Sequence, residues 1–352
     1  MNIQEYNFLS LLRYAVHGGE ISLQQPVDYG QILAMARAHN LQALVGEILC
    51  QDTDFLSAPE YGDVVRMVMG QVNAQAVRTD AFLKLYRQLS DAGVYPIVMK
   101  GLICRQLYGE YCDHRPSSDE DVLIRQEEFG KVQKVLESCG YRMDDKQETV
   151  TEKQLEKLQE ITFYNEEAEL YIEVHTNPIG LENSLRRKMN NCFQNVFDAP
   201  RRVEIEGTEI LAMNHTDHFL FLVLHAFKHM MTRGFGIRQV LDILLYQEQY
   251  GTEIDWTYIY KCLKQISAER FFTDIITIGN RYLGFSLSSP YQPNCPQDLL
   301  EDLLSNGAFG NTTQAQVTAV QMTGAAVASG KKSNKMLLLI KTIFPSKSRL
   351  MP

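Results

Sequence analysis

Two aspartates one residue apart, Asp119 and Asp121, lead directly into an apolar run at residues 122–124. The run indicates a buried strand that begins with the acidic pair. Side chains on a strand alternate between its two faces, so both aspartates point to the same face. Two like charges held this close repel, and they need a cation or shared protons to compensate them. The chain is therefore expected to fold around a strand that presents an ionic site.

A third carboxylate lies inside another strand-like run, Leu-Tyr-Ile-Glu-Val-His at residues 170–175. In this run Glu173 shares one face with Tyr171 and His175. Hard divalent cations such as Mg²⁺ prefer oxygen ligands and keep contact with substrate phosphates. Three carboxylates from two neighbouring strands can bind a pair of metals roughly 3.5–4 Å apart. The pattern predicts a two-metal site formed by Asp119, Asp121 and Glu173.

The order of patterns along the chain predicts an α+β protein with four parts. Helical periodicity fills the first part, and short strand-like runs mark the second. Helical periodicity returns in the third, and the last part is a basic tail without acidic residues. The expected boundaries are 1–93 for the N-terminal helical region, 94–213 for the α/β core, 214–305 for the C-terminal helical domain and 306–352 for the tail.

The expected elements can be placed by their residue numbers. A long helix over 60–92 should end at Gly93, because glycine tolerates positive φ. Thr216 and Asp217 offer caps for a helix that runs through Met231. Strands are expected at 95–99, 119–124, 161–165 and 170–175, and a hairpin is expected at 203–205 and 210–213 around a turn at 206–208. Further helices are expected at 102–108, 127–139, 237–250, 256–266 and 269–283.

The composition narrows the possible partners and the compartment. The formal net charge of −9 argues against binding to long nucleic acid or to an anionic membrane. The seven cysteines form no CxxC pair, which argues against a zinc ribbon and a secreted disulfide framework. No signal peptide or run of membrane-spanning length is visible, so we expect a cytoplasmic location. The basic tail is interpreted as a solvated helix face, or as an arm that closes over a polyphosphate.

Several motifs in this order resemble the nucleotidyltransferase superfamily that includes DNA polymerase β and the antibiotic nucleotidyltransferases. More narrowly, the chain looks like the bacterial group of uncharacterised nucleotidyltransferases. The resemblance covers about residues 95 to 250. It rests on Lys100-Gly101, Arg115, Ser117-Ser118-Asp119-x-Asp121, Gly140-Tyr141, Glu173-x-His175, and His225-Ala226-x-Lys228-His229 followed by Arg238 and Asp242.

The resemblance implies a fold, a reaction and roles for the acidic residues. The fold is a small mixed β-sheet core flanked by helical regions. Asp119 and Asp121 would bind both metals, Mg²⁺ or Mn²⁺, and Glu173 would bind the catalytic metal and orient or deprotonate an acceptor hydroxyl. The reaction would transfer a nucleoside monophosphate from a nucleoside triphosphate to that hydroxyl, with release of pyrophosphate.

The resemblance also implies where the triphosphate is held. Lys100 and Gly101 stand where the superfamily usually has a Gly-Ser or Gly-Gly pair, and there a helix N-terminus receives phosphate oxygens. Because Lys100 precedes the glycine here, its side-chain ammonium is also expected to bind a phosphate oxygen. Arg115, Ser117 and Ser118 could donate hydrogen bonds to the β- or γ-phosphate.

Other polar residues have open interpretations. His175 and His229 are candidates for contact with the nucleotide, and His225, Lys228 or His229 could lie near the nucleotide or the acceptor. His225 and His229 share a helix face and could bind zinc, although no HExxH pattern is present; a hydrogen-bonded pair is the alternative. Arg238 and Asp242, also four residues apart, could form an ion pair on one helix. Glu120 should point away from the metals, into solvent or toward Arg115 or another base.

Aromatic residues and rival functions complete the expectations. Tyr108, Tyr111 and Trp256 could stack on a nucleobase, although core packing explains them as well. A non-catalytic module that binds a nucleotide or a protein, as an antitoxin or a regulatory subunit does, is the main rival function. Phosphodiester hydrolysis is a weaker one, because no HD-type histidine cluster is present. The acceptor, the base preference and the oligomeric state stay open.

Overall fold

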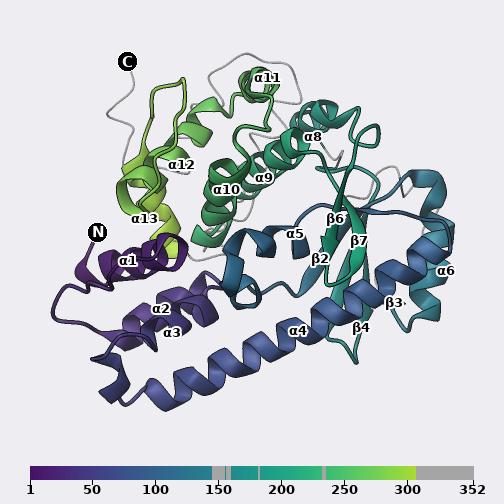
Figure 1. Cartoon of the computed structure of the whole chain (residues 1–352). Helices are drawn as coiled ribbons and strands as arrows, with labels where there is room; N and C mark the ends of the chain where they lie inside the picture. Colours follow the sequence, from purple (N-terminus) through teal and green to yellow (C-terminus); the bar gives the residue numbers. More distant parts are fainter. Residues whose placement is uncertain (145–154, 156–159, 181–182, 232–234, 307–352) are drawn as a thin grey trace.

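The computed structural model describes residues 1–144, 155, 160–180, 183–231 and 235–306. The described part of the chain is an α+β protein with one mixed seven-stranded sheet and helical regions on both sides of it in sequence (Figure 1). This confirms the expected fold class. Apart from Asn306, the basic tail at 306–352 lies outside the described residues.

The N-terminal region is helical, as expected. Its longest helix agrees with the expected range to within one residue at each end, and Gly93 follows its last turn with φ of +72°. The elements are α1 (Ile3–His17), α2 (Tyr29–Ala38), α3 (Gln42–Leu49), the 3₁₀ helix η1 (Phe55–Ser57) and α4 (Tyr61–Asp91).

The sheet has the strand order β3-β4-β5-β2-β1-β7-β6. Strand β2 pairs in parallel with β5 and antiparallel with β1, so it lies in the interior of the sheet. The β1–β7 pair is also parallel, and the β3–β4, β4–β5 and β6–β7 pairs are antiparallel. The strands are β1 (Ile97–Val98), β2 (Asp119–Leu123), β3 (Arg142–Met143), β4 (Ile161–Asn165), β5 (Leu170–His175), β6 (Arg201–Ile205) and β7 (Thr208–Ala212).

The strand predictions differ from the structure in a few places. Strand β1 is shorter than predicted, and β3 was not predicted. The turn of the β6–β7 hairpin consists of Glu206 and Gly207, with φ of +48° and +72°, whereas Thr208 already belongs to β7. Two consecutive positive φ angles match the right-handed twist of the flanking strands, which explains why two residues close this hairpin.

Short helices connect the strands, and a second set of helices follows them. The helix expected at 102–108 is only one α-helical turn followed by a 3₁₀ segment, with a kink at Gly109. The connecting elements are α5 (Leu102–Arg105), η2 (Gln106–His114), η3 (Gln126–Glu128), α6 (Phe129–Ser138), α8 (Ser184–Asn190) and η5 (Asn191–Phe193).

In the C-terminal helical region, the expected cap of the first helix was wrong. Asn214 is the N-cap residue, and its side chain accepts a hydrogen bond from the backbone N–H of Asp217. The first backbone N–H groups of a helix have no partner within the helix, and an asparagine side-chain oxygen at the N-cap accepts a hydrogen bond from one of them. The next three helices agree with the predicted ranges, and the last was not predicted. The region contains α9 (His215–Met230), α10 (Ile237–Tyr250), α11 (Trp256–Ile266), α12 (Glu269–Tyr282) and α13 (Pro296–Asn306).

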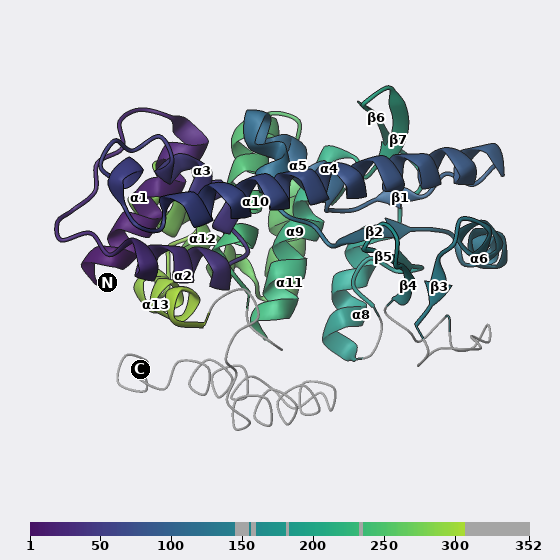
Figure 2. The same cartoon turned by 90° about the horizontal axis from the view of Figure 1, so that it is seen from below.

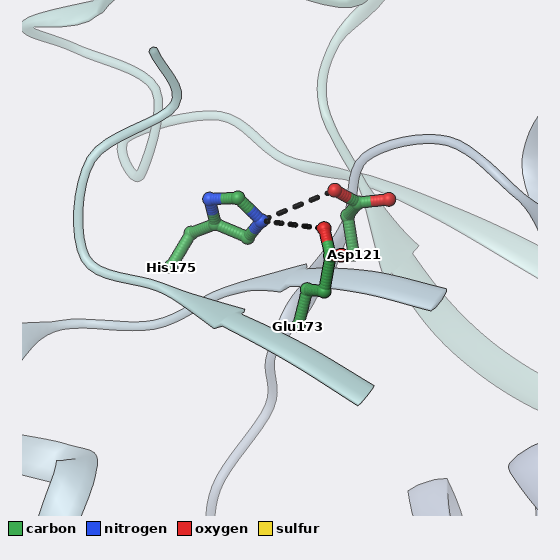
Figure 3. A group of neighbouring side chains, drawn as sticks. All are labelled: Asp121, Glu173 and His175. Atoms are coloured by element: carbon green, nitrogen blue, oxygen red, sulfur yellow. Dashed lines mark hydrogen bonds and ion pairs between the residues drawn. The ribbon is translucent and has the colours of Figure 1, made fainter. Parts of the chain in front are cut away.

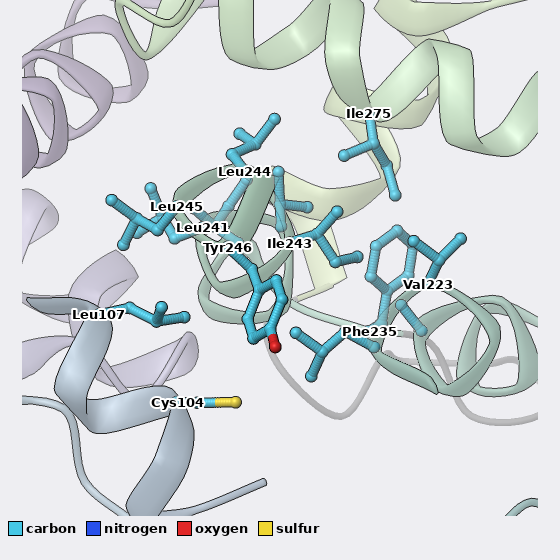
Figure 4. Packing of buried hydrophobic residues seen from close by; sticks show 14 of the residues in the cluster. Cys104, Leu107, Val223, Phe235, Leu241, Ile243, Leu244, Leu245, Tyr246 and Ile275 are labelled. Atoms are coloured by element: carbon cyan, nitrogen blue, oxygen red, sulfur yellow. The ribbon is translucent and has the colours of Figure 1, made fainter. Parts of the chain in front are cut away.

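The described helices and strands bury two hydrophobic clusters. One joins α1–α3 to α9–α13, and it includes Cys104 and Leu107 from the segment that follows β1 (Figure 4). The other lies between the sheet, α6 and the C-terminal half of α4. Figure 2 shows α4 along one face of the sheet and α8 on the opposite side. The segment after β1 is therefore held by the sheet and by the C-terminal helices together.

Within the described ranges, no helix has the length and the apolar character needed to cross a membrane.

Candidate functional site

The acidic residues of two parallel strands converge on one face of the sheet. Strand β2 pairs with β5 so that Asp121 lies opposite Glu173 and Asp119 lies opposite Tyr171. In a parallel pair, residues at matched positions point to the same face, with neighbouring strands about 4.8 Å apart. The structure thus brings Asp121, Glu173 and His175 together, as Figure 3 shows.

Asp121 is the most enclosed of these carboxylates, with 1% of its surface exposed. Its Oδ1 lies 3.1 Å from Nε2 of His175, and its Oδ2 lies 3.0 Å from Nζ of Lys100. Burial alone would raise the pKa of Asp121, but Lys100 and His175 together hold it well below its usual range. The ionised form of Asp121 is therefore favoured, with Lys100 against one oxygen and His175 against the other.

The environment of Glu173 differs from that of Asp121. Its carboxyl is partly open to solvent, and one oxygen lies 3.8 Å from Nε2 of His175. Burial first, and then the charge of Asp121, raise the pKa of Glu173 to about 7. Two neighbouring carboxyls with pKa values pushed apart are the arrangement in which one stays ionised and the other exchanges a proton near neutral pH.

His175 and Lys100 supply the positive charge. Burial would lower the pKa of His175, but its hydrogen bonds to Asp121 and Glu173 raise it to about 9, so the ring is an imidazolium at neutral pH. Burial also disfavours the charged form of Lys100, yet Asp121, Asp119 and Glu173 outweigh it and raise the pKa of this lysine. The site is thus charge-compensated by protein groups.

Potential metal ligands are gathered at the same place. One oxygen each of Asp121 and Glu173 and one nitrogen of His175 all lie within 4.8 Å of one another. A buried group of this kind could bind a metal ion, for which His175 would have to lose its proton if its ring were a ligand. Asp119 does not belong to this group. Its carboxylate is partly exposed, and its Oδ2 is 3.8 Å from Nζ of Lys100.

A pocket adjoins the acidic residues on the β1 side of β2. Its wall combines the residues after β1, the loop before β2, and side chains from α9 and α10. It is lined by Lys100, Gly101, Arg115, Ser117, Asp119, Leu222, His225, Arg238, Gln239 and Asp242. Of the predicted phosphate-binding residues, four line this pocket: Lys100, Gly101, Arg115 and Ser117. Ser118 is exposed and lies outside the pocket lining.

Two guanidinium groups line this pocket, that of Arg115 buried and that of Arg238 partly buried. Arg115 donates two hydrogen bonds to Asp242, of 2.8 and 2.6 Å, and Tyr108 donates a third to the same carboxylate. Arg238 donates to the carbonyl oxygen of Pro116 at 2.5 Å. Nη1 of Arg115 and Nε of Arg238 have no hydrogen-bond partner among the described residues. Buried donors in this state are suited to an anionic ligand.

The expected ion pair between Arg238 and Asp242 was therefore wrong. The i,i+4 spacing places the two residues on one side of α10, but Asp242 pairs with Arg115, which is 127 residues away in sequence. Arg115 presents two parallel N–H groups to both carboxylate oxygens, and this bidentate geometry is stronger than a single contact along a helix. Sequence spacing gave no sign of this pairing.

Glu120 points away from the acidic site and toward a base other than Arg115, namely Arg105, which is one of the expected alternatives. Its Oε2 accepts a 2.8 Å hydrogen bond from the backbone N–H of Leu102, and its Oε1 lies 3.8 Å from Arg105. Burial raises the pKa of Glu120 to about 7. Gly101 has φ of +56°, and a Cβ there would lie 2.2 Å from Oε2 of Glu120. The carboxylate of Glu120 thus accepts the hydrogen bond of the backbone N–H at the start of α5, which the resemblance predicted to bind a phosphate oxygen.

The two histidines of α9 contact each other. Nε2 of His225 lies 3.2 Å from Nε2 of His229, which agrees with the hydrogen-bonded alternative to zinc. His225 lines the pocket, whereas His229 does not. Burial, followed by Lys228 and Lys100, keeps the pKa of His225 well below its usual value. The motif around these histidines was visible in the sequence, but nothing marked His225 as the one facing the pocket.

Taken together, the fold and the site define an α+β protein with a potential metal site next to a cationic pocket. A family model described as uncharacterised nucleotidyltransferase matches residues 25–284, which is well over half of the chain. The chain therefore belongs to this nucleotidyltransferase family. Neither the search of curated proteins nor the search of solved structures found a match.

Proposed function

We propose that this chain is a metal-dependent nucleotidyltransferase of the DNA polymerase β-like superfamily. It moves a nucleoside monophosphate from a nucleoside triphosphate to a hydroxyl acceptor and releases pyrophosphate. One observation carries the proposal: Asp121 and Glu173 face each other across parallel strands, and the adjacent pocket contains the buried guanidinium group of Arg115 and the partly buried one of Arg238. Acidic metal ligands and a cationic pocket are the two requirements for handling a triphosphate.

The donor atoms fit a hard divalent cation. Asp119, Asp121 and Glu173 offer carboxylate oxygens, which suit Mg²⁺ and Mn²⁺. His175 is protonated and donates to Asp121, so its role in this proposal is to orient that carboxylate. When bound, the metal would neutralise phosphate charge and increase the electrophilicity of the α-phosphorus.

The pocket is the proposed place of the triphosphate. The free N–H groups of Arg115 and Arg238 would bind phosphate oxygens, and Ser117 and Gly101 would form the adjoining wall. The ammonium group of Lys100 lies between the aspartates and the pocket, so it would bind a phosphate oxygen once a metal replaces it at Asp121. Arginine is suited to this role because its planar fork matches two phosphate oxygens.

The proposed reaction needs one proton transfer and one displacement. Glu173 accepts the proton of the acceptor hydroxyl, because its carboxylate is the partly exposed one beside Asp121. The acceptor oxygen forms a bond to the α-phosphorus, and the bond from that phosphorus to the bridging oxygen breaks. The electron pair leaves with pyrophosphate. In this proposal residues 94–213 form the catalytic core, and residues 1–93 and 214–305 support it.

A non-catalytic binding module is the second candidate. Lys100 and His175 already compensate the carboxylates without a metal, and such an ion-paired site could bind a nucleotide passively. The two candidates differ in one measurable respect, because only the transferase requires a divalent cation for tight binding of a nucleoside triphosphate.

Isothermal titration calorimetry separates these candidates. Each of the four nucleoside triphosphates is titrated into the protein, once with excess Mg²⁺ and once with a chelator. The transferase predicts binding with metal only, lost in Asp121→Asn and weakened in Asp119→Asn. Asp63→Asn, an exposed aspartate on α4, is the matched control. Equal binding without metal would favour the module, and no binding by the folded wild type would refute both the transferase and a nucleotide-binding module.

A further inference from the structure

The longest helix, α4, has one side that faces solvent. In Figure 1 this helix runs along the lower edge of the molecule, and Figure 2 views that side from below. Its other side packs into the two hydrophobic clusters. Residues three, four or seven positions apart share one face of a helix. The exposed stripe that results, here called the α4 face, consists of Arg66, Met69, Gly70, Asn73, Ala76, Val77 and Asp80.

Two large apolar side chains on the α4 face are open to solvent. Met69 is 67% exposed and Val77 is 50% exposed. Single exposed apolar side chains are ordinary on a protein surface, but these two lie four residues before and four residues after Asn73. Between them are the small residues Gly70 and Ala76. Small residues allow a second helix to approach closely, because the distance between packed helices depends on the side chains at the contact.

Opposite charges flank this apolar centre at equal spacing. Arg66 lies seven residues before Asn73, and Asp80 lies seven residues after it. On its own helix Arg66 pairs with Asp63, and Asp80 pairs with Lys84, and more than half of each of these side chains is exposed. Exposed ion pairs are weak, so Arg66 and Asp80 are both able to take a further partner. The α4 face is therefore self-complementary when its sequence is reversed about Asn73.

A twofold axis reverses the sequence in this way. In a symmetric dimer, residue i of one copy meets residue j of the other, and j meets i. If two α4 helices cross antiparallel at Asn73, Arg66 of each copy lies at Asp80 of the other, and Met69 lies at Val77. A parallel contact would instead place like charges together at positions 66 and 80. Charge complementarity therefore selects the antiparallel arrangement of two copies of this chain.

We propose that the α4 face is the interface of a homodimer, in which the two α4 helices pack antiparallel with Asn73 at the centre. Its seven residues per copy are fewer than the roughly 20–30 per side of a standard interface, so the dimer is weak and reversible. We expect a Kd on the order of 10 µM. This inference concerns a surface away from the pocket and is independent of the proposed nucleotidyl transfer.

Sedimentation equilibrium of the full chain tests the interface. The average mass of the wild type should rise with concentration from 40.2 kDa toward twice that value. Asp80→Arg places an arginine against Arg66 of the other copy at both ends of the contact, and Arg66→Asp places an aspartate against Asp80. Each variant should raise the dimer Kd by about tenfold or more, because like charges across an interface repel. Circular dichroism confirms that each variant is folded.

Recombining the two substitutions tests the pairing and its direction. In an equal mixture of Asp80→Arg and Arg66→Asp, every charged contact between unlike copies is attractive again, so dimers should return. The double variant Arg66→Asp with Asp80→Arg should dimerise by itself, because the two charges are exchanged within each copy. In a parallel contact the double variant would still place like charges together, so its dimerisation is specific to the antiparallel arrangement.

Asp91→Arg is the matched control. It makes the same change of charge as Asp80→Arg at an exposed position eleven residues further along α4, beyond the α4 face, and should dimerise as the wild type does. The inference is overturned if the wild type keeps the mass of one chain up to about 200 µM, well above the expected Kd. It is also overturned if Asp80→Arg dimerises as the wild type does, if Asp91→Arg weakens the dimer equally, or if the mixture of the two single variants forms no dimer.

Discussion

Replacing Asp242 with asparagine should destabilise the protein strongly, because it leaves the guanidinium group of Arg115 buried without a counter-charge. Both side chains are almost fully buried, with 4% of Arg115 and 5% of Asp242 exposed. The pair shares two hydrogen bonds of 2.8 and 2.6 Å, and Tyr108 adds a third of 2.9 Å to the same carboxylate. Asp242→Asn keeps the shape of the side chain and removes only the charge and one acceptor.

The size of the effect follows from this burial. Removal of one partner from a buried ion pair typically costs about 3–5 kcal/mol, chiefly because the remaining charge stays desolvated. A domain is stable by only about 5–15 kcal/mol, so the loss should be a large part of the total. Urea unfolding followed by circular dichroism measures it, as a lower midpoint at an unchanged slope.

An exposed pair on α4 provides the matched control. Arg66 and Asp63 form an ion pair with more than 70% of each side chain exposed, and Asp63→Asn should cost less than about 1 kcal/mol. The double replacement Arg115→Met with Asp242→Leu should recover most of the loss, since it removes both charges. A cost for Asp242→Asn as small as that of Asp63→Asn would refute the reasoning.

Two further substitutions test other parts of the structure. Gly101→Ala should lower the free energy of unfolding by about 2 kcal/mol more than Gly109→Ala in urea titrations, because both glycines have positive φ but only a Cβ at 101 meets Glu120; equal costs would contradict the close approach. Burial lowers the pKa of His39 to about 4. As the pH drops from about 6.5 toward 4, the imidazole of His39 gains a proton in the unfolded chain before it does in the folded protein. The free energy of unfolding should therefore fall over this range by up to about 3 kcal/mol. Urea unfolding at several pH values should show a shallower fall in His39→Leu than in the wild type, and identical falls would count against this assignment.

The acidic centre was accessible to sequence reasoning because its geometry is local to two strands. The period of two places Asp119 and Asp121 on one face, and a glutamate in the middle of an apolar strand predicts a neighbour that compensates it. The convergence of Asp121 with Glu173 followed once the two strands were expected to adjoin. The register itself required the structure.

The surroundings of that centre were not accessible in the same way. The partner of Arg115 is on a helix 127 residues later, and only the i,i+4 spacing of Arg238 and Asp242 was visible, which suggested a different pair. Nothing in the sequence indicated that Glu120 would accept a hydrogen bond from Leu102. Such contacts depend on tertiary packing, because a spacing rule applies only within one helix or strand.

The length and placement of α4 limit how this protein can move. Its 31 residues span about 46 Å at 1.5 Å per residue, and the helix belongs to the sheet cluster at one end and to the N-terminal helices at the other. At its centre the side chain of Gln75 accepts a hydrogen bond from Ser117 N–H, and the Thr79 hydroxyl accepts one from Arg105. A hinge between the sheet and helices α1–α3 would require this rod to bend beside the pocket. Such a hinge would also have to break the contacts of Gln75 and Thr79, so α4 holds the sheet and helices α1–α3 in one fixed arrangement.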